Sequence, residues 1–140
     1  MAGESIVVYG ITVNAVTSGA SVINTAFSVA PTSSVVGSHV LADAVLSGTF
    51  AVAPVASQSV HLYRRDMNIK GVSAAPAPLA SNKNIYVGSF ILSTDVTQTI
   101  NLPAIPLSPD CEFYIENDSG QTLNAGWTLD IKPFGYGIAP

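Results

Sequence analysis

Four acidic residues lie close together near the carboxyl end of the chain: Asp110, Glu112, Glu116 and Asp118. Carboxylate oxygens are the ligands that calcium and magnesium prefer, provided that several of them converge on a point about 2.4 Å away. All four acids occupy even-numbered positions, so in a strand they share one face with Tyr114. Residues two apart in a strand are about 6.5–7 Å apart, too far for a straight strand to wrap one ion. We therefore expect the solvent-facing side of a β-hairpin rather than a metal site.

The alternate positions of the same segment predict a buried strand face. They carry Cys111, Phe113, Ile115 and Asn117, and we expect Phe113 and Ile115 in the core. The single cysteine excludes an internal disulfide and is expected to pack as a small apolar group. The turn residues that follow include Gly120, which suits a positive φ angle.

The only tryptophan lies on the strand after this turn. Trp127, Leu129 and Ile131 share parity and form one apolar face, which predicts a place in the core. The functional alternative is a ring platform for a sugar or a base. That alternative would require a row of exposed aromatic rings, for example Trp127 with Tyr136 or Tyr86.

The histidines and serines show no spacing that is typical of a catalytic or metal site. His39 and His61 fall in strand-like segments, and no third ligand is spaced to complete a metal site with them. A serine–histidine–acid set can be chosen from so many serines, but no GxSxG nucleophile elbow occurs. A glycine-rich phosphate loop and a CxxC pair are also absent from the sequence. We therefore expect a protein that is not an enzyme and binds no cofactor.

The segment YRRD, from Tyr63 to Asp66, gathers two of the five cationic residues beside an acid and an aromatic ring. Arginine and tyrosine are favoured at protein interfaces, which predicts that Tyr63, Arg64, Arg65 and Asp66 form a contact surface. The structural alternative is an ion pair at a strand end between Asp66 and either arginine, which stabilises little when exposed. The sequence leaves both interpretations open.

Charge and composition exclude some function classes. Charged residues make up 10% of the 140 residues, against roughly 25% in an ordinary domain. The net charge of −4 argues against binding to nucleic acid, which needs a basic face. No apolar run reaches the ~18 residues of a membrane span, and the acidic start does not resemble a signal peptide, so we expect a protein made in the cytosol. Low charge with 48% hydrophobic residues suggests a surface covered by other subunits.

The distribution of β-branched and turn residues predicts an all-β fold. The expected strands are residues 5–13, 21–29, 39–52, 59–69, 84–92, 97–105, 111–118 and 126–134. Short strands with frequent turn signals and no helical periodicity favour an antiparallel β-sandwich, with a jelly roll as the first choice. The alanine- and proline-rich segment 71–83 is expected to be a long surface loop.

The first 35 residues differ from the rest in their low complexity. We expect residues 1–35 to form an N-terminal arm or edge strands, and residues 36–140 to form the sandwich domain. An apolar arm is an aggregation hazard unless it is paired, within the subunit or between subunits. The residues of this segment that we expect at an interface are Tyr9, Val13, Val22 and Phe27.

Several motifs resemble a family of small β-rich virion structural proteins of tailed bacteriophages. They are LYRR leading into NIKG, the alanine–proline loop, YVGSF, and the closing segment from FYIEN to AGWTL. The resemblance covers about Val60 to Phe134 and concerns packing and turn patterns. In several phages such proteins are capsid decoration, or cement, subunits.

The resemblance implies a structural role in the virion. Such a subunit would lie on the capsid surface, bridge neighbouring major capsid proteins and form a homotrimer on local threefold axes. Its partners would be the major capsid protein and copies of itself, with no nucleic acid and no membrane. The alternatives are a carbohydrate-binding module and a tail-fibre or receptor-binding β-sandwich.

Overall fold

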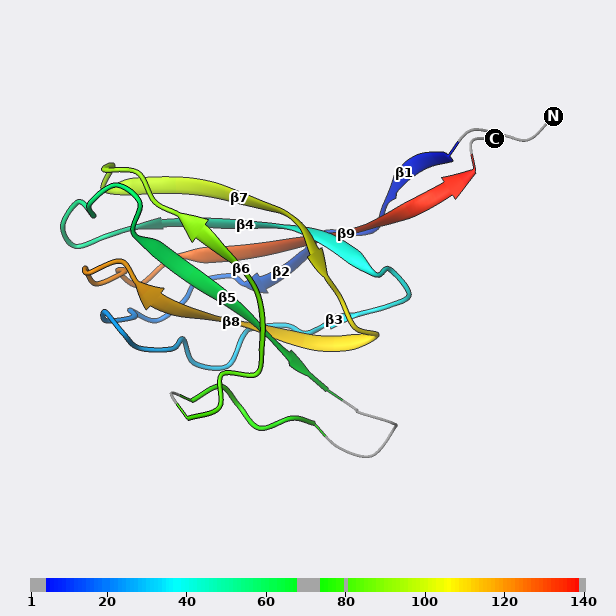
Figure 1. Ribbon diagram of the computed structural model, residues 1–140, viewed down its shortest axis with the longest axis horizontal. Coiled ribbons are helices and arrows are strands. Elements are labelled where there is room, and N and C mark those ends of the chain that lie inside the picture. The colour runs from blue at the N-terminus through cyan, green and yellow to red at the C-terminus, as the bar shows by residue number, and fades with distance from the viewer. Residues whose placement is uncertain (1–4, 68–73, 80, 139–140) are drawn as a thin grey trace.

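Two antiparallel sheets packed face to face make up the fold (Figure 1). The computed structural model describes residues 5–67, 74–79 and 81–138, so parts of the expected arm, strand 59–69 and loop 71–83 lie outside the described residues. The first sheet contains β1 (Ser5–Tyr9), β2 (Val13–Val16), β4 (Leu41–Thr49), β7 (Thr97–Pro106) and β9 (Thr128–Ile138). The second sheet contains β3 (Val35–Val36), β5 (Ser59–Asp66), β6 (Ile85–Ile91) and β8 (Asp110–Asp118). The described residues hold no helix long and apolar enough to cross a membrane.

The strand pairing is that of a jelly roll. Strands β2 to β5 pair in turn with β9, β8, β7 and β6, as they do when one long antiparallel hairpin is rolled up. Rolling also brings β4 beside β9 and β5 beside β8, which closes each sheet across its middle. The expected all-β, antiparallel, jelly-roll-like sandwich is therefore confirmed.

Alternating side chains build the core between the sheets. In β4 the buried residues are Ala42, Ala44 and Leu46, with their neighbours on the outer face half-buried. The five residues that the sequence places in the core are each at most 2% exposed: Phe113 and Ile115 on β8, Leu129 and Ile131 on β9, and Trp127 just before β9. At about 25 cal/mol per Å² of buried apolar surface, such aromatic and branched side chains dominate the stability of the sandwich.

Most of the amino-terminal segment belongs to the sandwich itself. Ala15, Val16, Val22 and Val35 are members of the same hydrophobic cluster as the strands that follow. The expected boundary between residues 35 and 36 does not separate two units, because β3 spans it and pairs with β8. The expected strand 21–29 is also wrong: this segment makes only isolated bridges, at Val22 and Phe27.

The two ends of the described chain form a two-stranded extension of the first sheet. Strand β4 pairs with β9 only as far as Phe134, whereas β1 follows β9 from Phe134 to Ile138. Figure 1 shows this pair leaving the body of the sandwich, and Ser5 pairs with Ile138 at its far end. We call residues 5–9 together with residues 134–138 the terminal ribbon.

Candidate functional site

The acidic face of β8 is covered around Tyr114 and Glu116, contrary to the expectation of a solvent-facing hairpin, while Asp118 at the strand end stays exposed. The expected parity is present, since the alternate residues Cys111, Phe113, Ile115 and Asn117 are all buried in the core. On the other face, however, Tyr114 is 3% exposed and Glu116 is 9% exposed. The cover comes from Phe27, which bridges to Glu116, and from the loop that leads into β6. The sequence missed this cover because it comes from two segments far away in the chain.

Three of the four clustered acids each contact a basic side chain of their own, and the pairs are Arg65–Glu112 (3.2 Å), Lys83–Glu116 (3.0 Å) and His61–Asp118 (3.1 Å). Because each carboxylate turns toward its own partner, the oxygens do not converge on one point. Accordingly, no group of three or more possible metal ligands occurs among residues 5–67, 74–79 and 81–138. Two of these pairs join β5 to β8, and the Lys83–Glu116 pair ties the loop before β6 to β8.

Burial and charge change the acidity of the groups on this face. Burial, followed by the nearby carboxylate of Glu116, raises the pKa of Tyr63. Burial also raises the pKa of Tyr114, whose hydroxyl donates a hydrogen bond of 2.8 Å to Glu112. The hydrogen bond to Glu116 raises the pKa of the Lys83 amine. All three groups therefore hold their protons more firmly in the folded protein.

A serine–histidine–aspartate set does come together on the second sheet. The Nδ1 atom of His61 lies 2.7 Å from Oγ of Ser89, and its Nε2 atom lies 3.1 Å from Oδ2 of Asp118. Since the hydroxyl of Tyr86 also lies 2.5 Å from Oγ of Ser89, the serine is held in a hydrogen-bonded chain. These residues come from three adjacent strands of an open sheet face, and none lines the hollow described next. The set is a hydrogen-bonded network of side chains that joins three strands.

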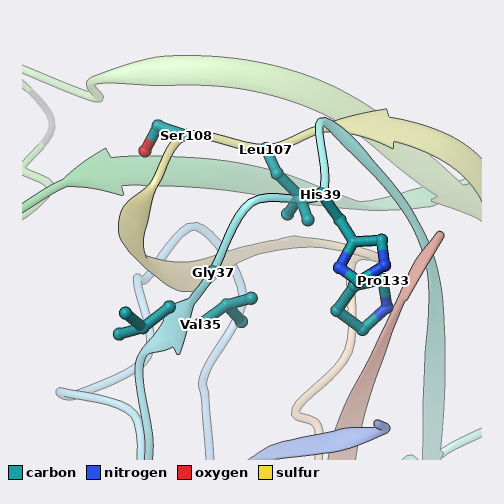
Figure 2. A pocket seen from close by; sticks show the side chains of 7 residues that line it. Val35, Gly37, His39, Leu107, Ser108 and Pro133 are labelled. Atoms are coloured by element: carbon teal, nitrogen blue, oxygen red, sulfur yellow. The ribbon is translucent and has the colours of Figure 1, made fainter. Parts of the chain in front are cut away.

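A small hollow that shares no residue with this network lies beside His39. Figure 2 shows its lining, which includes Val35, Gly37, His39, Leu107 and Pro133. Its volume is about 10 Å³, which is the space of a single water molecule. The lining is mostly apolar, so the hollow offers no set of groups for catalysis or for a cofactor.

The YRRD segment is engaged within the subunit. Arg64 forms an ion pair with Asp66 at 2.8 Å and donates a hydrogen bond to the carbonyl of Pro106. Arg65 donates to Glu112 and to the carbonyl of Ala75. Tyr63 is only 8% exposed and packs edge-on against Phe27, with ring centroids 5.7 Å apart. The expected ion pair at the strand end is thus present, and the side chains expected at an interface already form contacts within the subunit.

The four interface residues expected in the amino-terminal segment fall in different environments. Val22 is 3% exposed in the core, so its assignment to an interface is wrong. Phe27 is half-buried against Tyr63, and Val13 is half-buried against the core cluster. Of the four, Tyr9 alone is freely accessible, at 53% exposed. Its place on the terminal ribbon makes that ribbon one accessible part of the expected arm, beside the exposed Ile11, Ile23 and Val29.

The terminal ribbon is uncharged and apolar on both faces. Cross-strand pairs put Val7 beside Tyr136 and Tyr9 beside Phe134 on one face. The other face carries Ile6 and Val8, opposite glycines of β9. The exposed fractions are Ile6 40%, Val7 43%, Val8 43%, Tyr9 53% and Tyr136 70%. The run IVVY, without the polar alternation of a half-buried strand, is the sequence signal for this feature.

Trp127 cannot serve as a ring platform. It is 2% exposed, and its Nε1 atom donates a hydrogen bond of 2.8 Å to the carbonyl of Ala20. Tyr86 and Tyr136, the other rings considered for a platform, are 56% and 70% exposed. They lie in different sheets, on β6 and β9, and so do not form a row with the tryptophan.

Comparison with known proteins finds no match among models of protein families, curated proteins or solved structures.

Proposed function

We propose that this protein is a non-enzymatic structural subunit of a bacteriophage particle, a capsid decoration protein that contacts neighbouring shell proteins through its terminal ribbon. The ribbon carries the proposal. A water-exposed two-stranded pair with apolar side chains on both faces gains stability when another surface covers it. The resemblance of several motifs to small virion proteins of tailed phages is the reason for proposing a phage particle as the assembly.

The polar groups of the second sheet support a structural role over a catalytic one. The acids Glu112, Glu116 and Asp118 are each paired with a basic side chain of the same chain. The Ser89 hydroxyl is held between His61 and Tyr86. Groups that are already satisfied in this way stabilise the sheet and leave little capacity for a substrate.

The proposed mechanism is the addition of many weak contacts on one rigid shell. An apolar strand pair can add to the edge of a neighbouring sheet or pack on an apolar patch of the major capsid protein. Each contact is small, but repeated copies that bridge adjacent capsid proteins resist expansion of the shell together. The protein would then lie on the outer surface of the virion.

The experiment that tests this proposal is removal of the ribbon strand without damage to the core. Deletion of residues 2–9 removes β1, whereas deletion of residues 1–30 would also remove the buried Ala15, Val16 and Val22 and unfold the sandwich. We expect the shorter deletion to remain folded and to lose co-sedimentation with undecorated phage heads. Val55→Lys, at a position 68% exposed on the body, is the control and should still bind. Full binding of the folded deletion variant would refute the proposal.

A glycan-binding or receptor-binding module is the second candidate, and the exposed ring of Tyr86 favours it. The ring stands beside His61, with centroids 6.1 Å apart, and near the accessible carboxylate of Asp118. Aromatic rings beside polar groups are suited to sugar faces. A glycan array tests this candidate: it requires specific binding that Tyr86→Ala abolishes.

A further inference from the structure

We infer that the first partner of the terminal ribbon is a second copy of this chain, joined by antiparallel pairing of the two β1 edges around a twofold axis. The inference rests on the proposed function, because it names a partner for the same ribbon.

Strand β1 has an open edge. In the described residues β1 pairs with β9 alone, so its other edge presents unpaired backbone N–H and C=O groups along Ser5–Tyr9. The edge of β9 that pairs with β4 is open only beyond Phe134, where two of the residues of β9 are glycines. Glycine weakens a strand and specifies its register poorly, so β1 is the better edge for pairing.

Strand β1 also lacks the features by which proteins protect edge strands. Such features are prolines, charges, bulges and very short length. The edge strand β7 contains Pro103 and Pro106. The edge strand β6 has a register shift against β5 near Gly88, and β3 is only 2 residues long. Strand β1 reads SIVVY, with no proline and no charge, and its ladder with β9 has no register shift.

The terminal ribbon lacks a hydrophobic core of its own. Its strands come from opposite ends of the chain, so no tight turn joins them, and every residue of β1 is exposed. Two strands alone are marginally stable in water, whereas three or more with an apolar face are stable. Pairing of two β1 edges converts two ribbons into one four-stranded sheet.

Strand β1 is complementary to a second copy of itself in antiparallel pairing. In the antiparallel register centred on Val7, this residue faces Val7 of the second copy, Ile6 faces Val8, and Ser5 faces Tyr9. Branched and aromatic residues in cross-strand pairs are favourable, and the absence of charge avoids repulsion between identical strands. The two sandwiches then lie at opposite ends of the joined ribbon. The aromatic face with Tyr9 and Tyr136 stays available for the shell.

The test uses purified protein and sedimentation equilibrium over a range of concentrations. We expect the wild type to form a dimer, and Val7→Lys to weaken it by at least about tenfold, because two like charges then meet at the axis. Val7→Asp should do the same, and an equimolar mixture of the two variants should pair again. Val55→Lys, on the body, is the matched control and should dimerise as the wild type does.

A cross-link tests the register directly. Oxidation of the Val7→Cys variant should join two copies by a disulfide at position 7, whereas Val55→Cys should not cross-link. The native Cys111 is buried. A monomeric wild type, a trimer, dimers unaffected by Val7→Lys, or failure of the Val7→Cys link would each overturn the inference. Head binding is measured separately: binding by a monomer refutes the inference alone, and a dimer that ignores heads refutes the proposed function alone.

Discussion

Gly19 and Trp127 lie so close together that a Cβ atom on Gly19 would stand 2.1 Å from Cε2 of the indole ring. The backbones of the two residues are joined as well, because the Gly19 amide donates a hydrogen bond of 2.8 Å to the Trp127 carbonyl. The segment around Gly19 is thus a wall of the tryptophan pocket, and it cannot be detached from the sandwich as an arm.

Gly19→Ala should therefore destabilise the fold strongly. The added methyl group must displace buried ring atoms, and overpacking of this kind costs about 1–3 kcal/mol. Urea unfolding should show a lower midpoint for this variant. Gly135→Ala is the matched control, since its Cβ would meet only His39, at the ordinary contact distance of 3.7 Å. Equal midpoints for the two variants would contradict the close packing.

Trp127 should be shielded from solvent in the native protein. Its ring is 2% exposed, so we expect slow quenching of its fluorescence by acrylamide, and fast quenching once the protein unfolds. A useful comparison is the double variant Trp127→Phe, Tyr136→Trp, which moves the indole to a site 70% exposed and should be quenched readily. Free quenching of native Trp127 would revive the ring-platform hypothesis.

Stability should fall above about pH 10. Burial first, then Glu116, raises the pKa of Tyr63, so the folded state keeps a proton that the unfolded state loses near the ordinary value of about 10. The raised pKa values of Tyr114 and Lys83 act in the same direction. The folded state then binds more protons than the unfolded state, and the free energy of unfolding falls as pH rises.

Urea midpoints measured from pH 7 to pH 11 test this dependence. Tyr63→Phe should reduce the loss above pH 10, because one of the responsible groups is gone, and its hydrogen bond to Glu116 is long at 3.5 Å. Tyr136→Phe, at an exposed position, should keep the wild-type profile. Indistinguishable slopes for wild type and Tyr63→Phe would show that Tyr63 is not a source of the effect.

The Ser89–His61–Asp118 network should behave as a structural feature. We expect no hydrolysis of p-nitrophenyl esters beyond that of Ser89→Ala, and no labelling of Ser89 by a fluorophosphonate, because the hydroxyl lies on an open sheet face between His61 and Tyr86. Labelling that His61→Phe abolishes would instead establish a reactive serine.

The sequence by itself was sufficient for the fold class and for the inward residues of the long strands. Alternation in a strand depends only on neighbours along the chain, so the parity of Trp127, Leu129 and Ile131 could be read directly. The same local rule placed Phe113 and Ile115 in the core. It could not distinguish strand 21–29 from an extended segment held by isolated bridges, since both have the same composition.

Only the tertiary structure decided what covers the other face of each strand. Glu116 is polar and even-numbered, yet it is buried because Phe27 and Lys83 reach it from segments distant in the chain. The opposite holds for Val7, which is apolar but exposed because β4 stops pairing with β9 at Phe134. Local pattern determines which side chains share a face, whereas the burial of that face depends on long-range pairing that no local pattern encodes.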